Sequence, residues 1–317
     1  MGRPLLVLRA LGLGDALTGV PALRGLRRLV FPRPVLLAAP ASIGRWMVDL
    51  SVVDGFVDTR GLDGPAPGRD LGAHDAVDLH GNGHLSRDLL AAAAPGHLLA
   101  FAPPGGTGVP WRPDEHEVLR WCRLVGSSGA RCGPDDLRLV PPPVAAPDGR
   151  APVVLHPGAA SGSRRWPPRR WAEVASWLVG QGHRVVLTGS ADERDLCAAV
   201  AAAAGLDRTA MTAGTLGLQA LAGLVAGARL VLCGDTGVAH LATALSVPSV
   251  LLFGPVSPAA WGPAIDPALH AVLWHGDGRG DPHGAEPDPH LLLITADEVL
   301  AATSRALATP AAPALRR

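Results

Sequence analysis

Hydrophobic and polar positions along this chain alternate in the rhythm of an α/β protein. In the second half, short apolar runs of strand length alternate with segments whose apolar residues recur at helical spacing. The apolar runs predict buried strands at 153–156, 185–188, 230–233 and 249–252. The helical segments lie at 168–180, 191–204, 216–226 and 237–245. Strands separated by helices of this length predict right-handed crossovers and a parallel sheet.

The first half shows the same rhythm less sharply. Its apolar runs predict strands at 5–8, 35–38 and 75–79, with helices at 16–29 and 114–125. A proline-rich stretch over 141–152 then predicts a linker. The expected fold class is therefore α/β, with two doubly wound, Rossmann-like domains that face a cleft between the carboxyl ends of their sheets.

The linker sets the expected domain boundaries. We predict an N-terminal domain over 1–145 and a C-terminal domain over 152–290. A final helix over 291–308 is expected to pack back toward the N-terminal domain, and the tail from Thr309 is expected to be disordered.

Composition narrows the class of protein. The 317 residues include 28 basic and 28 acidic side chains, so no basic excess favours a nucleic-acid partner. No apolar run is long enough to cross a bilayer, and the apolar segment at the N-terminus is too short for a signal peptide. These features predict a cytoplasmic protein that makes at most peripheral contact with a membrane. The oligomeric state stays open.

Cysteine and histidine spacing gives no support for a metal or a disulfide scaffold. Four cysteines are widely scattered, and the three histidines of a Gly/Asp/Pro-rich run at 275–290, which we expect to be a mobile loop, lack regular ligand spacing. We expect neither a metal nor a cofactor. Because the chain contains no lysine, any cation that binds phosphate must be arginine or a protonated histidine.

The most informative segment is the apolar strand at 230–233 with the turn that follows it. Asp235, Thr236 and Gly237 form the turn, and His240 follows one helical turn later. A helix N-terminus presents unpaired backbone N–H groups and a partial positive charge, which suit a phosphate or pyrophosphate. An ordinary strand–helix junction, with Asp and Thr as caps, explains the same residues equally well.

A second strand–turn–helix segment begins at Leu5. Gly12 and Gly14 open the turn, and Asp15 starts the helix. In a partly desolvated cleft a carboxylate can act as general base toward a sugar hydroxyl. The alternative is that Asp15 only caps the helix, which is a common role for this residue type.

Two further segments bring polar side chains to strand ends. After the strand at 153–156, small residues leave room for a diphosphate, Ser161 can donate a hydroxyl, and Arg165 can neutralise charge. After the strand at 185–188, Glu193 can accept hydrogen bonds from a ribose, or it can simply complement a helix dipole. The adjacent Arg164 and Arg165 would ordinarily be solvated surface residues, but strand ends are where α/β proteins bind ligands.

Taken together, these segments resemble glycosyltransferase family 9, the heptosyltransferase-like enzymes. The resemblance rests on the segments 9–15, 75–82, 156–167, 234–240 and 253–255, in that order. It implies a GT-B fold, an acceptor in the first domain, and an ADP-linked donor sugar in the second. It also implies an inverting transfer that requires no metal.

The resemblance also implies roles for individual residues. Asp15 matches the catalytic base, and Arg165 stands where the family usually has a lysine on the pyrophosphate. The remaining donor-side positions are Ser161, Glu193, Asp235, Thr236, Gly237 and His240. The acceptor-side candidates are Gly12, Gly14, His80 and Asn82.

The predicted function is transfer of a heptose-like sugar from a nucleoside diphosphate to a hydroxyl of a glycan, a glycolipid or a small molecule. A nucleotide-sugar epimerase on a similar fold would need no acceptor, which separates it from a transferase. A non-catalytic nucleotide-sugar-binding protein is the other alternative. The sequence identifies neither the acceptor nor the base and sugar of the donor.

Overall fold

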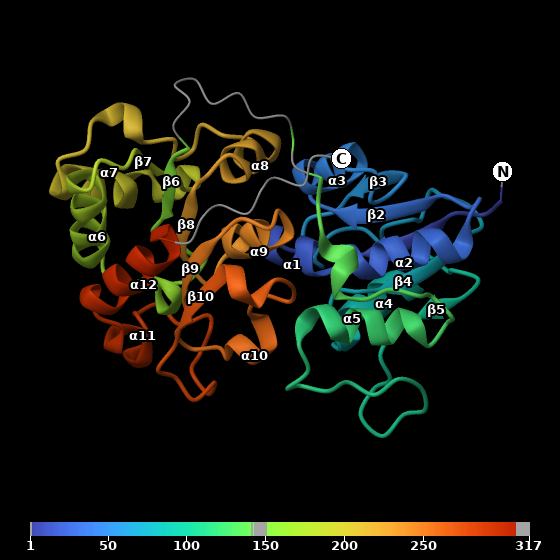
Figure 1. The fold of residues 1–317 in the computed structure, drawn as a ribbon. Coiled ribbons are helices and arrows are strands. Elements are labelled where there is room, and N and C mark those ends of the chain that lie inside the picture. The colour runs from blue at the N-terminus through green and yellow to red at the C-terminus, as the bar shows by residue number, and fades with distance from the viewer. Residues whose placement is uncertain (1, 141, 143–150, 309–317) are drawn as a thin grey trace. The chain divides into compact units, whose positions relative to one another are not determined.

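A computed structural model describes residues 2–140, 142 and 151–308. The chain divides into two compact units, Met1–Leu139 and Val140–Arg317, which we describe separately (Figure 1). The predicted linker at 141–152 lies largely outside the described residues, as does the tail from Thr309. The predicted domain boundaries near it therefore stay predictions.

The N-terminal unit contains a sheet of five parallel strands. These are β1 (Leu5–Leu8), β2 (Val35–Ala39), β3 (Gly55–Asp58), β4 (Asp75–Asp78) and β5 (Leu98–Leu99). Their order across the sheet is β3-β2-β1-β4-β5, and every pair is parallel. The chain runs from β1 outward to β3 and then returns to the other side of β1. The point where the strand order reverses therefore lies between β1 and β4.

Helices cover this sheet. They are α1 (Leu13–Thr18), α2 (Val20–Val30), α3 (Ala41–Asp49), α4 (His84–Ala91) and α5 (Glu117–Gly126), with a 3-10 turn η1 at Pro134–Leu137. The single helix predicted at 16–29 is wrong, because Gly19 separates α1 from α2. Pro21 lacks the N–H that would continue the first helix. Gly19 also leaves space for Arg9, since a Cβ there would lie 2.9 Å from the Arg9 Cδ.

The C-terminal unit repeats the architecture. Its strands are β6 (Val153–His156), β7 (Val185–Leu187), β8 (Leu230–Gly234), β9 (Ser249–Leu252) and β10 (His270–Leu273). Their order is β10-β9-β8-β6-β7, and all pairs are parallel. Here the order reverses between β6 and β8. The parallel α/β sheet predicted from the sequence is thus confirmed in both units.

The helices of this unit follow the predicted positions closely. They are α6 (Pro168–Gly180), α7 (Arg194–Ala204), α8 (Leu218–Ala226), α9 (Gly237–Ala244), α10 (Pro258–Trp261), α11 (Pro289–Leu293) and α12 (Ala296–Ala308). Four 3-10 turns accompany them, η2 (Gly162–Arg164), η3 (Ala191–Glu193), η4 (Arg208–Ala210) and η5 (Pro267–Leu269). The helix predicted at 191–204 begins as η3 because Ser190 and Glu193 form a capping box there.

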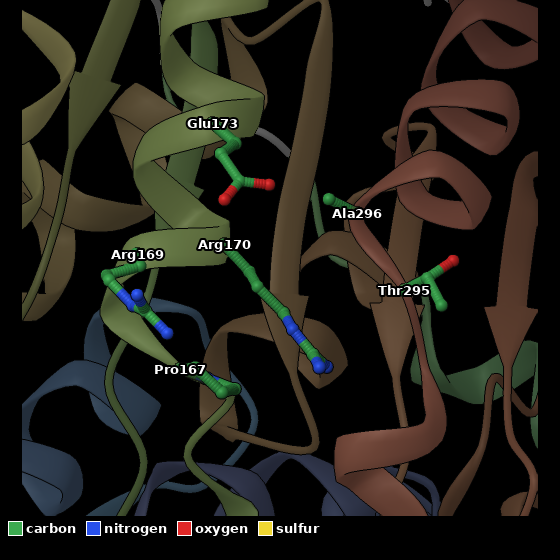
Figure 2. A pocket seen from close by; sticks show the side chains of 6 residues that line it. All are labelled: Pro167, Arg169, Arg170, Glu173, Thr295 and Ala296. Carbon is green, nitrogen blue, oxygen red and sulfur yellow. The ribbon is translucent and has the colours of Figure 1, made fainter.

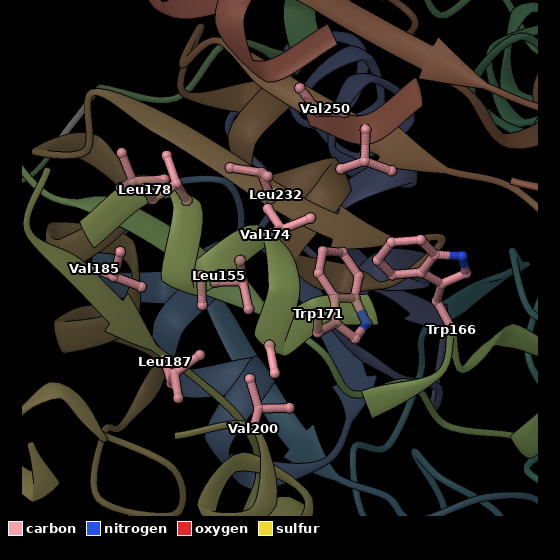
Figure 3. Close-up of a cluster of buried hydrophobic side chains, with 14 of the residues drawn as sticks. Leu155, Trp166, Trp171, Val174, Leu178, Val185, Leu187, Val200, Leu232 and Val250 are labelled. Atoms are coloured by element: carbon pink, nitrogen blue, oxygen red, sulfur yellow. The ribbon is translucent and has the colours of Figure 1, made fainter. Parts of the chain in front are cut away.

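Apolar side chains from one face of the sheet and from α6, α7 and α12 form a core of the C-terminal unit (Figure 3). Leu155 and Leu232 project from the central strands, and Val174 and Leu178 pack on them from α6. Trp166 and Trp171 meet edge to face with ring centroids 4.9 Å apart. This geometry suits aromatic quadrupoles and buries a large apolar area. The core therefore fixes the start of α6, which follows the loop at the carboxyl end of β6.

The last helix belongs to this core. Val299 and Ala302 of α12 are buried in it, and the helix packs on α6, β9 and β10. Its predicted contact with the N-terminal domain stays a prediction. Of the helices that the structure describes, none combines the length and the apolar character required to span a membrane.

Candidate functional site

Strand topology indicates where each unit binds a ligand. In open α/β sheets, ligands bind outside the carboxyl ends of the strands at the point where the strand order reverses. In the C-terminal unit this point lies beyond β6 and β8. The loop at 157–165 follows β6, and the turn at 235–236 follows β8. Both segments carry residues predicted from the sequence as donor-binding.

Arg164 is the cation that these two loops hold between them. Its Nη1 lies 3.6 Å from Asp235 Oδ2, and its Nε donates to Ser161 Oγ at 3.2 Å. The Asp235 side chain is 7% exposed and that of Arg164 is 21% exposed. Asp235 therefore fixes the guanidinium near the start of α9. The resemblance pointed to Arg165 as the pyrophosphate contact, whereas the tertiary contact with Asp235 singles out its neighbour Arg164.

Arg165 has a different environment. It is exposed, and its Nε donates to the carbonyl of Ala159 at 2.9 Å, within its own loop. The predicted contact of Arg165 with a pyrophosphate stays a prediction. Ser161, also predicted, lies in the same loop as Arg164 and hydrogen-bonds to it.

The N-terminus of α9 supplies backbone donors beside Arg164. Thr236 is the N-cap, and its Oγ1 accepts from the Val238 N–H at 3.3 Å. Across the described residues, no hydrogen bond engages the backbone N–H of Thr236 or Gly237. These two N–H groups and the helix dipole offer positive potential to an anion. Capping and anion binding are thus compatible roles for Thr236.

The histidine-containing run at 275–290, predicted as a mobile loop, is hydrogen-bonded to the loop after β6. Ser163 N donates to Gly284 O at 2.9 Å, and Asp288 N donates to Ser163 O at 3.1 Å. Gly162 is required here, because a Cβ would lie 1.6 Å from the Ala285 carbonyl oxygen. The run therefore supports the outer side of the loop that holds Arg164.

Glu193 lies on the β7 side of the same edge. Its side chain is buried, and its Oε2 accepts from the Ser190 N–H at 2.7 Å. His156 Nε2 lies 4.0 Å from that oxygen. Burial lowers the pKa of His156, and the Glu193 carboxylate opposes this shift. A Cβ at Gly158 would clash with Glu193, so the loop after β6 approaches this carboxylate closely.

His240 lies inside α9, one turn after the N-cap. Its side chain is buried and its ring centroid is 6.0 Å from that of Trp261, with the planes at 63°. The sequence predicted His240 as a residue that lines the site. It gave no sign of the aromatic partner, because Trp261 is far away along the chain.

In the N-terminal unit the order reverses between β1 and β4, so the loops at 9–12 and 79–83 lie at the corresponding edge. Gly12 precedes α1 as its N-cap, and Asp15 lies in the first turn of the helix. The Asp15 side chain is 30% exposed and its Oδ1 is 3.8 Å from Arg9 Nη2. Gly14, which directly precedes Asp15 in the sequence, is half-buried. The structure thus presents Asp15 at the predicted edge, next to a buried cation.

Arg9 hydrogen-bonds to both segments of this edge, the one after β1 and the one after β4, although the sequence did not single it out. Its side chain is 1% exposed and donates to the main-chain oxygens of Asp15 and Leu79. Its Nη2 also donates to Thr18 Oγ1 at 2.8 Å and to Glu117 Oε1 at 3.2 Å. A charged residue directly after four apolar strand residues was the available signal. Arg9 therefore positions both loops of this edge.

Glu117 compensates this buried charge. Its Oε1 accepts from Trp121 Nε1 at 2.8 Å, and its Oε2 accepts from Arg120. The guanidinium carbon of Arg9 lies 4.7 Å from the centroid of the Trp121 ring. One carboxylate thus stands between two buried arginines, with an indole ring as a further partner.

His80 occupies the second loop of this edge. Asp78 fixes its backbone, since Oδ1 accepts from the His80 N–H at 2.9 Å. Burial, together with the charge of Arg9, lowers the pKa of His80 to about 4. Its Nδ1 is buried and has no hydrogen-bond partner among the described residues. A neutral imidazole here can donate a hydrogen bond to a ligand or accept one from it. Asn82, the other predicted residue of this loop, follows two positions later and is exposed.

A separate cavity of about 280 Å³ lies in the C-terminal unit between the starts of α6 and α12 (Figure 2). The lining side chains include Arg169, Arg170 and Glu173. Arg170 is already engaged, because its Nη1 donates to the carbonyls of Leu292 and Ile294 at 2.7 Å each. None of the predicted donor-contacting residues lines this cavity. Among the residues described, no cluster of three or more His, Cys, Asp or Glu side chains has the arrangement to hold a metal ion.

We expect Glu117→Ala to destabilise the N-terminal unit by about 3–5 kcal/mol, because Arg9 and Arg120 would be left buried and unpaired. Urea denaturation followed by circular dichroism measures this loss. Asp135→Ala is the control: its carboxylate is 90% exposed and pairs with Arg138 at 3.5 Å, so the loss should be at most about 1 kcal/mol. Equal effects of the two substitutions would contradict the role given to Glu117.

We expect His80 to weaken the fold in acid. Its pKa is about 4 when folded and 6.5 when unperturbed, so the folded state binds fewer protons between these values. The stabilising contribution is present above pH 6.5 and is lost as the pH falls through about 4. Denaturation at several pH values should show a smaller acid loss for His80→Gln than for the wild type, whereas the exposed His84→Gln should follow the wild type. Identical slopes for all three proteins would show that His80 titrates normally.

Sequence comparison identifies relatives over part of the chain. Residues 141–276 match glycosyltransferase family 9 (heptosyltransferase). Lipopolysaccharide heptosyltransferase 1 of Pseudomonas aeruginosa is 40% identical over 111 residues, which cover 35% of this chain and 30% of that protein. Lipopolysaccharide heptosyltransferase 2 of Salmonella typhimurium is 37% identical over 106 residues, covering 32% of this chain and 30% of that protein. The match therefore spans less than a third of the length of each of these relatives.

Structural comparison extends over nearly the whole chain. The structure of Escherichia coli ADP-heptose lps heptosyltransferase II covers 96% of this chain and 98% of its own, with a TM-score of 0.75 and 22% identity. At this identity the likeness concerns the fold, and it confirms the predicted GT-B class. The family match covers residues 141–276, so the resemblance predicted from the motifs at 156–167, 234–240 and 253–255 is confirmed there, whereas the motifs at 9–15 and 75–82 lie outside it.

Proposed function

We propose that this protein is an inverting, metal-independent glycosyltransferase. It moves a heptose-like sugar from a nucleoside-diphosphate donor, preferentially ADP-linked, to a hydroxyl of a glycan, a glycolipid or a small molecule. The observation that carries the proposal is Arg164, fixed by buried Asp235 beside the free N–H groups at the start of α9. The names of the matched relatives, which are heptosyltransferases, support the sugar and the base.

The donor side must stabilise the charge that develops on the leaving diphosphate. Arg164 supplies a full positive charge, and the N–H groups of Thr236 and Gly237 supply directed donors. Because Asp235 and Ser161 hold the guanidinium in place, little reorganisation is needed as the bond breaks. Such an arrangement can do the work of a divalent cation, which is why we propose a transfer without metal.

The acceptor side must remove one proton. In the proposed step the acceptor oxygen attacks the anomeric carbon on the face opposite the diphosphate, and its proton passes to the Asp15 carboxylate. One C–O bond forms while the C–O bond to phosphate breaks, so the configuration inverts. No second carboxylate is required, unlike the pair used in glycoside hydrolysis. Neutral His80 and the exposed Asn82 are proposed to orient the acceptor, and Gly12 and Gly14 leave room for it.

We expect Arg164→Gln to weaken ADP binding by about tenfold or more, because a charge-assisted hydrogen bond to phosphate is lost. Calorimetric titration with ADP, UDP and GDP, each with and without magnesium, measures this change and the base preference. Arg165→Gln is the matched control and should have the smaller effect, since Arg165 is exposed and its Nε is bonded to Ala159. A larger loss of ADP affinity in Arg165→Gln would show that Arg165, and not Arg164, contacts the phosphate. Failure of the folded wild type to bind any of the three nucleotides would refute the proposed donor site.

We expect Asp15→Asn to slow sugar transfer by about 100- to 10,000-fold while ADP affinity stays unchanged, because only the proton acceptor is removed. Release of ADP from ADP-heptose, with heptose-deficient lipopolysaccharide core and other glycans as acceptors, measures the rate. Asp88→Asn, at an exposed position of α4, is the control. Full activity of an Asp15→Ala protein would refute the base assignment. Turnover of ADP-heptose that needs no acceptor and yields an epimer would favour the epimerase instead.

A further inference from the structure

We propose that the indole of Trp261 is the surface against which the transferred sugar of the donor binds. This inference rests on the proposed function and adds to it a residue that selects the sugar. It follows from three observations: the side of the sheet on which Trp261 lies, the contact it makes with α9, and the polar atom that it leaves without a partner.

The strand order makes the two sides of the proposed donor site different from each other. From the reversal between β6 and β8, one direction leads to β7 and the other leads to β9. The β7 side carries Glu193, whose chemistry suits ribose hydroxyls. With the diphosphate at the start of α9, a nucleoside on the β7 side leaves the β9 side for the sugar. The segment after β9 is the one that contains α10 and Trp261.

Trp261 contacts the helix that would bind the diphosphate. Its ring lies 6.0 Å from the ring of His240, at an angle of 63°, and His240 is one turn from the N-cap Thr236. This edge-to-face packing fixes the plane of the indole. The Trp261 side chain is therefore held against the first turns of α9, the helix whose start is the proposed phosphate position.

The exposed part of this side chain has the chemistry of a sugar platform. Trp261 is half-buried, so part of its ring faces solvent. Across the described residues its Nε1 has no hydrogen-bond partner, as is also true of the buried Nε1 of Trp171, but the half-buried Trp261 can present this donor to a ligand. A pyranose offers C–H groups to an aromatic face and hydroxyl oxygens to an N–H donor. Trp261 can satisfy both at once.

A short, tightly hydrogen-bonded turn presents the ring. Ser257 caps α10 by accepting from the Ala259 N–H at 3.2 Å, and the Trp261 N–H donates to Ser257 O at 3.3 Å. Gly262 then closes the turn, since a Cβ there would lie 2.5 Å from the Pro258 carbonyl oxygen. The platform is thus preorganised, which reduces the ordering cost of binding.

Titration of the full chain with ADP and with ADP-heptose tests the inference. We expect Trp261→Leu to weaken ADP-heptose binding by about five- to tenfold and to leave ADP binding within about twofold, because only the sugar contacts the ring. Trp261→Phe, which keeps an aromatic face but lacks the N–H, should lose less. Trp177→Leu is the matched control: it is a half-buried tryptophan of α6, near the opposite edge of the same sheet, and both affinities should stay unchanged.

The outcomes separate the two proposals. Unchanged binding of ADP-heptose by both Trp261 variants would overturn the inference and leave the proposed function intact. An equal loss for ADP and ADP-heptose would also overturn it, because Trp261 would then contact the nucleoside. Failure of the wild type to bind ADP would instead refute the proposed function. Retained ADP affinity in a variant shows that the variant is folded.

Discussion

The reversal of strand order beside the first strand of each sheet is the constraint on which both candidate sites depend. The crossovers that leave the two central strands, β1 and β4 or β6 and β8, lead to opposite sides of the sheet. Their loops therefore separate at the carboxyl edge instead of packing flat against each other. A ligand-sized opening follows from topology, before any particular side chain is considered. The residues then decide what each opening can bind.

The two units supply charge to this edge in different ways. In the C-terminal unit the anion is buried: Asp235 holds Arg164, whose guanidinium stays partly exposed to solvent. In the N-terminal unit the cation itself is buried, because Arg9 donates its hydrogen bonds to two loop carbonyls and to Glu117. A buried ion pair adds little net stability, but it gives a defined geometry when all its hydrogen bonds are made. The first arrangement suits the binding of an anion, and the second suits the positioning of a carboxylate such as Asp15.

The sequence predicted the parallel sheets, most helices of the second unit and the strand ends at which the candidate site residues lie. It did so because buried parallel strands are continuous apolar runs and because strand ends were marked by Gly, Asp and Thr. The elements that it missed, among them β3 and β5, are short and only half-buried, so their apolar signal is weak. The break at Gly19 was missed because apolar periodicity continues across it. Family likeness alone could not have corrected this.

Side-chain roles were harder to predict than positions, because they depend on partners that are distant in sequence. Arg164 and Arg165 are neighbours in the motif and the resemblance pointed to Arg165, but the contact with residue 235 is made by Arg164. Arg9 meets Glu117 across more than a hundred positions, and this contact turns an ordinary strand-end arginine into the organiser of two loops. Residue type and spacing indicate that a loop can bind phosphate. They do not indicate which guanidinium is held in a fixed position to do so.

The absence of lysine makes this distinction consequential for function. A lysine ammonium is a compact charge that can reach a phosphate from several directions, whereas a guanidinium binds in a plane and needs that plane to be set. Asp235 and Ser161 set it for Arg164, which is a requirement that a lysine would not impose. Once the diphosphate is fixed in direction, the carboxylate on the β7 side and the indole on the β9 side are no longer interchangeable. In the proposed function, a nucleotide sugar would then be recognised as a molecule with two different ends, and its anomeric carbon would take one defined orientation.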